Sequence, residues 1–228
     1  MHPCWRPAPE PLEVGGPDHR AYVALYLTLL VLLLTRRELV RRRQELVRRL
    51  VVAVTVGQQV AMYGYHAHHR EGPAESLPLH ICRVATLAGL VWLLTDHPWA
   101  MDVVFYFGLY AYVSLVYPWG IARTDHAMGW SFAVNHVLTL LLPVLAATTH
   151  GWVPTLAGLA RAYAAFLVYL AVAERVNRVT GGNYFYLRER PLLVGVPERR
   201  SGRVAAAVTL VVFGLGYAAS RLVVRRPG

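Results

Sequence analysis

Apolar runs long enough to form membrane-spanning helices recur along this chain, separated by short polar connections. A spanning helix needs about 20 mainly apolar residues, and Pro or aromatic residues at its ends favour the headgroup level. Because a spanning backbone must satisfy its own hydrogen bonds, the pattern predicts an all-α, polytopic integral membrane helical bundle with about seven transmembrane helices. The predicted helices are residues 21–34, 50–65, 77–94, 100–117, 128–148, 155–176 and 204–224.

The length of 228 residues leaves little room for anything besides these helices. We therefore expect a flexible N-terminal tail at 1–20, a single transmembrane helical domain at 21–224 and a C-terminal tail at 225–228. The head of the chain is rich in Pro and acidic residues, unlike the basic start of a signal peptide, so the first apolar run is expected to be retained. The sequence predicts a multi-pass protein of the cell membrane.

Composition and charge agree with a membrane protein. The chain is 56% hydrophobic and 16% charged, with a mean hydropathy of +0.38, whereas about a quarter of the residues of a soluble domain are charged. Its net charge of +10 comes from arginines that lie between the apolar runs. We therefore expect membrane lipids, and not nucleic acid, as partners.

Metal and disulfide chemistry have weak support in the sequence. The two cysteines, Cys4 and Cys82, are too few for a disulfide framework or a zinc site. The histidine-rich stretch HAHHR at 66–70 lacks thiol or carboxylate neighbours at a fixed metal-ligand spacing. No metal and no cofactor are predicted.

The arginine-rich connection at 36–49 is expected to be cytoplasmic. With seven helices, the connection at 177–203, which is also arginine-rich, lies on the opposite side. Two explanations stay open. Either the arginines of this second connection are paired and partly buried, or one of the two short first helices does not span the membrane.

Counting crossings places several polar residues on one side of the membrane. Cys82 lies about 7 Å and His136 about 12 Å from the start of its helix, and both helices begin on the side opposite the first arginine-rich connection. The segment GGNYFYL at 181–187 belongs to the same side. Since His80 and Cys82 are two residues apart, they project in different directions on a regular helix. A Cys–His pair is therefore predicted across helices, between Cys82 and His136.

Four motifs occur in a characteristic order: LPLHIC at 77–82, YFGLY at 106–110, NHVLTLLLP at 135–143 and NYFYLRERP at 183–191. In these motifs the chain resembles the YwaF-type integral membrane protein family, which extends to a eukaryotic transmembrane cysteine acyltransferase of phospholipid metabolism. The resemblance covers about residues 20–224. It departs from the family pattern at Phe185, where Met is usual, and at the Gly181–Gly182 pair, where Gly-Thr is usual.

This resemblance implies a lipid acyltransferase or transacylase that works through a cysteine thioester, with Cys82 as nucleophile and His136 as acid and base. A phospholipid is the expected acyl donor. A thiol needs a positive or basic neighbour to react, and a developing oxyanion needs hydrogen-bond donors. The supporting candidates for these roles are His80, Arg83, Asn135, Asn183, Tyr184 and Tyr186.

Simpler interpretations stay open for each of these residues. Cys82 can be a small apolar residue, and His136 a neutral imidazole bonded to a neighbouring helix. His80 can cap its helix, while Arg83 can snorkel to the interface or meet a lipid phosphate. Two other function classes follow: a transporter or small-molecule binding protein that uses the same polar pocket without covalent chemistry, and a membrane scaffold. The sequence does not give the acyl acceptor or the oligomeric state.

Overall fold

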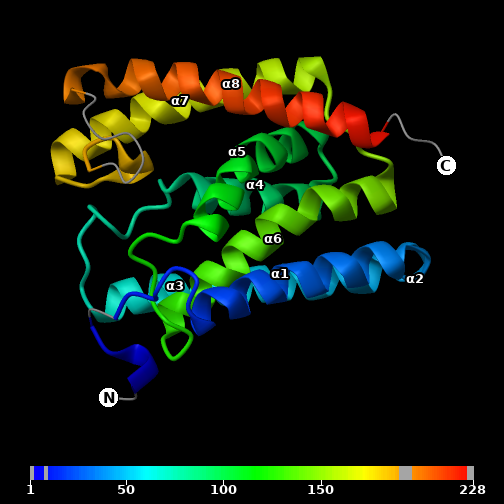
Figure 1. Cartoon of the computed structure of the whole chain (residues 1–228), viewed down its shortest axis with the longest axis horizontal. Coiled ribbons are helices and arrows are strands. Elements are labelled where there is room, and N and C mark those ends of the chain that lie inside the picture. Colours follow the sequence, from blue (N-terminus) through cyan, green and yellow to red (C-terminus); the bar gives the residue numbers. More distant parts are fainter. Residues whose placement is uncertain (1–2, 8–9, 190–196, 225–228) are drawn as a thin grey trace.

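The computed structural model describes residues 3–7, 10–189 and 197–224, and within them the fold is built from helices (Figure 1). Each of the seven apolar runs forms a helix, so the predicted fold class is confirmed. The elements are η1 (Pro3–Trp5), α1 (Pro17–Thr35), α2 (Arg37–Arg42), α3 (Gln44–His68), α4 (Ile81–Thr95), α5 (Pro98–Val116), α6 (Ala127–His150), α7 (Leu156–Thr180), η2 (Tyr184–Tyr186) and α8 (Glu198–Val224).

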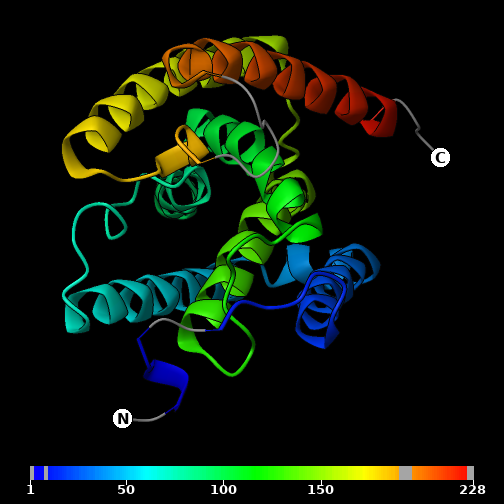
Figure 2. The same cartoon turned by 60° about the vertical axis from the view of Figure 1, so that its left-hand side comes forward.

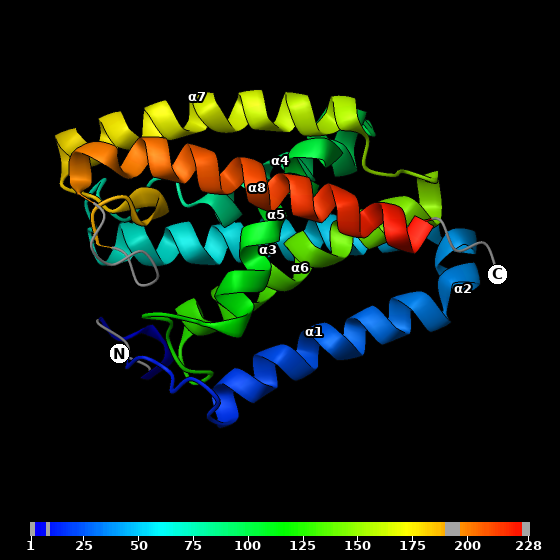
Figure 3. The ribbon, with the colours of Figure 1, turned by 45° about the horizontal axis from the view of Figure 1, so that its top comes forward.

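Five of these helices are long and apolar enough to cross a membrane by themselves: α1, α5, α6, α7 and α8. Helix α4 is apolar but shorter, and α3 begins with charged residues before its apolar part. Both run alongside the other helices of the bundle (Figure 3). The bundle therefore matches the predicted seven helices in number, although its two marginal members are α3 and α4.

Helices α4, α5 and α6 form the middle of the bundle, with α7 and α8 on one side and α1 and α3 on the other (Figure 2). Helix α5 is buried along most of its length, including Met101, Tyr106 and Phe107. Gly108 lets α5 approach α6 closely, because a Cβ at this position would lie 3.0 Å from the Thr139 side chain. This close packing holds the central helices in fixed register.

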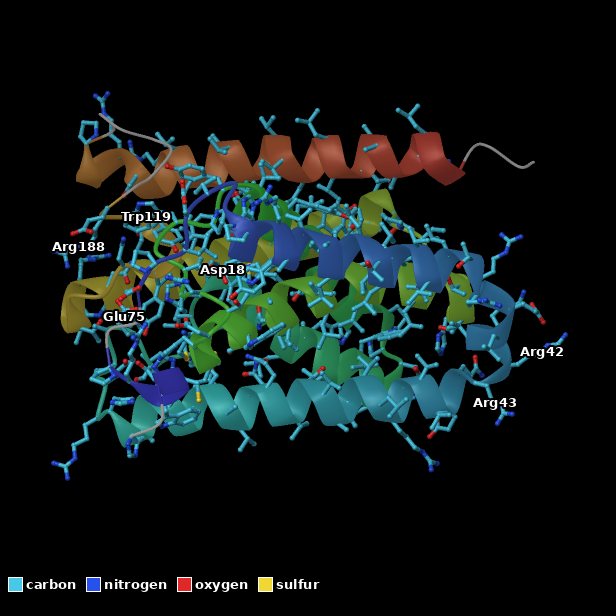
Figure 4. All side chains as sticks on the ribbon, turned by 60° about the horizontal axis from the view of Figure 1, so that its bottom comes forward. Asp18, Arg42, Arg43, Glu75, Trp119 and Arg188 are labelled. Atoms are coloured by element: carbon cyan, nitrogen blue, oxygen red, sulfur yellow. The ribbon has the colours of Figure 1, made fainter. Side chains whose placement is uncertain are left out.

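The two ends of the bundle carry different groups of charged residues. Arg42 and Arg43 project at the end formed by α2, while Glu75 and Arg188 lie toward the other (Figure 4). At the α2 end, the Asp96 carboxylate lies 2.9 Å from an Arg48 nitrogen. Arg188, in the described part of the second arginine-rich connection, thus lies at the end of the bundle opposite Arg42 and Arg43 of the first.

The described residues of the N-terminal head pack over the end of the bundle where α4 and α6 begin. The Arg6 carbonyl accepts a hydrogen bond from the Tyr65 hydroxyl and lies 2.9 Å from Nε2 of His126. Further along, the Leu12 N–H donates to the Ile121 carbonyl. The predicted C-terminal tail, 225–228, lies outside the described residues.

Candidate functional site

Cys82 lies in the first turn of α4, with 7% of its surface exposed. The helix begins at Ile81, four residues later than predicted. Pro78 disfavours a helical conformation at Leu77, whose N–H donates to the Tyr184 hydroxyl at 3.0 Å. His80 is consequently the N-cap residue, with an extended backbone, and does not occupy a regular helical position relative to Cys82.

A hydrogen-bond chain joins α4 to α6 one turn beyond Cys82. The Thr86 hydroxyl donates to the Cys82 carbonyl at 2.9 Å and accepts an N–H of the Asn135 side chain at 2.7 Å. It also lies 3.3 Å from the Thr139 hydroxyl. Because Asn135 directly precedes His136, this chain fixes the segment that carries the imidazole beside the helix that carries the thiol.

The His136 side chain is buried, with 8% of the residue exposed, and its Nδ1 lies 2.8 Å from the Phe132 carbonyl oxygen. A carbonyl only accepts hydrogen bonds, so Nδ1 carries the proton and Nε2 carries the lone pair. The carbonyl thus orients the ring. The sequence offered no carboxylate for this role. Asp102, the acidic residue on α5, is instead bonded to Arg161 at 2.7 Å.

Of the predicted oxyanion donors, Asn183 and Tyr184 have their side-chain bonds inside the connection after α7. The Asn183 amide donates to the Glu189 carbonyl and accepts the Arg188 N–H. The Tyr184 hydroxyl donates to the Pro73 carbonyl at 2.7 Å and so joins this connection to the one before α4. The Tyr186 ring lies 6.3 Å from that of His80 and 5.7 Å from that of Trp119, between ring centroids.

His80 and Arg83 lie at the mouth of this region, on either side of Cys82 in the chain. The His80 ring packs 5.0 Å from that of Tyr184, and its Nε2 lies 3.9 Å from a Glu75 carboxylate oxygen. Burial lowers the pKa of His80 from 6.5, and the interaction with His80 lowers the pKa of Glu75. An imidazole at this position is therefore held in its neutral form at pH 7.

Sequence reasoning did not assign two polar residues to this region: it missed Tyr169 and considered His66 only as part of the histidine-rich stretch at 66–70. The Tyr169 hydroxyl on α7 donates to the carbonyl of Leu79, three residues before Cys82, at 2.8 Å. His66 on α3 contacts both Glu71 and Arg83. A tyrosine within an apolar run and a histidine before a Glu-containing connection are the signals that could have drawn attention to them. Their lateral contacts are not visible in the sequence.

Two other features of the described residues bear on the predicted chemistry. No group of three or more His, Cys, Asp or Glu side chains in this part of the chain is arranged to hold a metal ion. A groove of about 590 Å³ opens between α3 and α4 at the α2 end, lined in part by Arg48, Val52 and Leu94. This groove is far from Cys82 along both helices.

Comparison with known proteins identifies the family of the chain. No curated protein matches, and no solved structure matches. The match to a protein family covers residues 15–217, which include Cys82, His136 and every helix from α1 to α7. The relation to YwaF-type proteins and to the cysteine acyltransferase stays a prediction, but the match over most of its length means that the chain belongs to the TMEM164 family.

Proposed function

We propose that this TMEM164-family membrane protein is a lipid acyltransferase or transacylase that forms a thioester on Cys82, with His136 as acid and base. The observation that carries the proposal is the orientation of His136: its Nδ1–H donates to the Phe132 carbonyl, so Nε2 can accept a proton. The Thr86–Asn135 hydrogen bond holds this imidazole on the helix beside the one that bears the thiol.

The proposed reaction has two steps, formation of the thioester and its breakdown. In the first, Sγ of Cys82 attacks the carbonyl carbon of a phospholipid acyl ester, its proton passes to Nε2 of His136, and the ester C–O bond breaks. His136 returns the proton to the departing lipid alkoxide, which leaves an acyl thioester. In the second, a lipid hydroxyl or water attacks the thioester, gives its proton to His136 and breaks the C–S bond. The thiol then takes the proton back.

Burial sets a condition on this chemistry. With 7% of its surface exposed, Cys82 meets an acyl ester only when neighbouring side chains move aside. The same burial excludes bulk water, which favours transfer of the acyl group to a lipid over hydrolysis. Tyr186, whose ring lies 6.3 Å from that of His80, is the donor candidate for the oxyanion that each step creates.

A cysteine-reactive, lipid-like probe tests the proposal on the purified full chain in lipid nanodiscs. We expect the wild type and Cys4→Ala to be labelled alike and Cys82→Ala to be spared, with an acyl thioester on Cys82 detected by mass spectrometry after incubation with phospholipid. Labelling of Cys82→Ala at the wild-type level would contradict the proposal. Full function in Cys82→Ser with loss in His136→Ala would favour a non-covalent binding protein or transporter instead.

A further inference from the structure

A cluster of polar side chains at the mouth of the site surrounds the guanidinium of Arg83. The guanidinium donates from one terminal nitrogen to two backbone carbonyls, that of Glu75 at 2.8 Å and that of Leu77 at 3.1 Å. The other terminal nitrogen lies 3.2 Å from Nε2 of His66. These bonds hold the half-buried arginine in one position, whereas a snorkelling side chain would be mobile.

The tautomer of His66 follows from these contacts. Arginine only donates hydrogen bonds, so Nε2 of His66 accepts from Arg83 and Nδ1 carries the proton. That proton is donated to the Glu71 carboxylate. With 4% of its surface exposed, His66 is thus a buried link between an acid and the guanidinium. From α3, His66 thus helps to hold the guanidinium of Arg83, which belongs to α4, in place.

The hydrogen-bond acceptors of the Arg83 guanidinium are two backbone carbonyls and an imidazole nitrogen, and none of them carries a negative charge. The nearby acids have other partners, since Glu71 bonds His66 and Glu75 lies 3.9 Å from His80. In the part of the chain that the structure describes, no carboxylate lies within salt-bridge distance of the guanidinium, and two of its five N–H groups lack an acceptor. A partly desolvated cation of this kind favours an anionic ligand.

A second polar group points to the same ligand. The Tyr63 hydroxyl on α3 is buried and has no hydrogen-bond partner among the described residues. The Tyr63 ring lies 6.2 Å from that of His66, between ring centroids, and His66 in turn contacts the guanidinium of Arg83. A buried hydroxyl without a partner is costly, so its place near an arginine that makes no salt bridge within the described residues needs an explanation. An oxygen-rich anion would accept from both groups.

We infer that Arg83 and Tyr63 bind the phosphate of a membrane phospholipid, with His66 and Glu71 as positioning residues. The inference rests on the proposed function for its meaning in the reaction, since Arg83 directly follows Cys82 in the first turn of α4. Anchoring of the phosphate at the mouth would present the acyl ester of the same lipid to the thiol. It also assigns the site a preference for phospholipids over neutral glycerides.

Binding measured in the Cys82→Ala background separates this inference from the catalytic one, because no acyl transfer is needed. We expect a short-chain diacyl phospholipid to bind about 10- to 100-fold more tightly than the matching diacylglycerol, the range of a charge-assisted hydrogen bond. Glycerol phosphate should compete weakly. If it binds as tightly as the phospholipid, the site takes a free phosphate ester and the lipid assignment is wrong.

Substitutions then test the residues. Added to Cys82→Ala, Tyr63→Phe and Arg83→Lys should each reduce the preference for phospholipid about tenfold. Arg70→Gln, at an exposed position in the connection between α3 and α4, should leave it unchanged. Tyr63→Phe removes a hydroxyl that makes no bond to the described protein, so a purely structural role predicts no loss of affinity. An unchanged preference in both variants would overturn the inference, whatever the outcome of the thioester experiment.

Discussion

The Thr86 hydroxyl on α4 accepts a hydrogen bond of 2.7 Å from the Asn135 side chain on α6, and donates in turn to the Cys82 carbonyl. Thr86 is 1% exposed and Asn135 is 4% exposed, so this contact lies in the interior of the bundle. It sets the rotation of α6 relative to α4, and with it the place of His136 relative to the thiol.

Thr86→Val should destabilise the protein by about 1–3 kcal/mol, because it leaves the buried Asn135 amide without its acceptor. Thermal unfolding in detergent, followed by tryptophan fluorescence, measures the effect. Thr148→Val is the matched control, since the Thr148 hydroxyl bonds only within its own helix, to the Val144 carbonyl. Equal melting temperatures for the two variants would show that the interhelical contact contributes nothing.

His136→Gln should slow labelling of Cys82 by a lipid-like probe about 10²- to 10⁴-fold, the range for loss of a general base. Glutamine keeps a hydrogen-bonding side chain of similar size but cannot take up a proton at neutral pH. His97→Gln, at an exposed position before α5, should label at the wild-type rate. If His136→Gln also labels at that rate, His136 serves only to join helices.

Gly129→Ala should cost about 1–3 kcal/mol, because the added methyl group would lie 2.1 Å from the Arg123 carbonyl and 2.5 Å from the Tyr22 hydroxyl. At Gly57, on the exposed face of α3, a Cβ meets nothing within 4 Å. Gly57→Ala should therefore stabilise the helix by about 0.5–1 kcal/mol. Chemical denaturation of both variants checks the two signs, and a loss of stability in Gly57→Ala would contradict the packing described for α3.

His80 should make stability depend on pH. Since burial lowers its pKa below 6.5 in the folded protein, the unfolded chain takes up the proton first as the pH falls. The contribution of His80 is complete above pH 6.5 and is lost as the pH falls through the folded pKa. Melting temperatures at pH 7.5, 6.5 and 5.5 should fall less steeply in His80→Gln than in the wild type.

The exposed His68→Gln is the control for this series and should keep the wild-type slope. A slope that is the same in His80→Gln and in the wild type would mean that His80 titrates alike in the folded and unfolded chains. A slope lost equally in His68→Gln would assign the effect to general surface charge.

The sequence determined the class of the protein and the side on which its chemistry is expected. Apolar runs of spanning length dictate helices, because a backbone in lipid must pair with itself, and successive crossings alternate in direction. That rule alone predicted Cys82, His136 and the segment at 181–187 on one side, and in the fold Tyr184 of this segment contacts Leu77 and His80 just before α4. The apolar pattern also predicted that α4 begins at Leu77, which is too early. The hydrogen bond that holds Leu77 in the connection comes from the Tyr184 hydroxyl, more than a hundred residues away, and is not visible in the local sequence.

Tertiary structure alone decided which side chains meet within that end. The rotation of each helix about its axis, and the identity of its lateral neighbours, depend on packing between segments distant in sequence. The Thr86–Asn135 bond, the His136 tautomer set by Phe132 and the contact of His66 with Arg83 all arise in this way. The motif predicted Asn183 and Tyr184 near the thiol, but their side chains bond to backbone groups of the connections. Asn183 donates to the Glu189 carbonyl in its own connection, and Tyr184 donates to the Pro73 carbonyl in the connection before α4. Direction across a bilayer is a property of one chain segment, whereas a site is a property of several segments packed together.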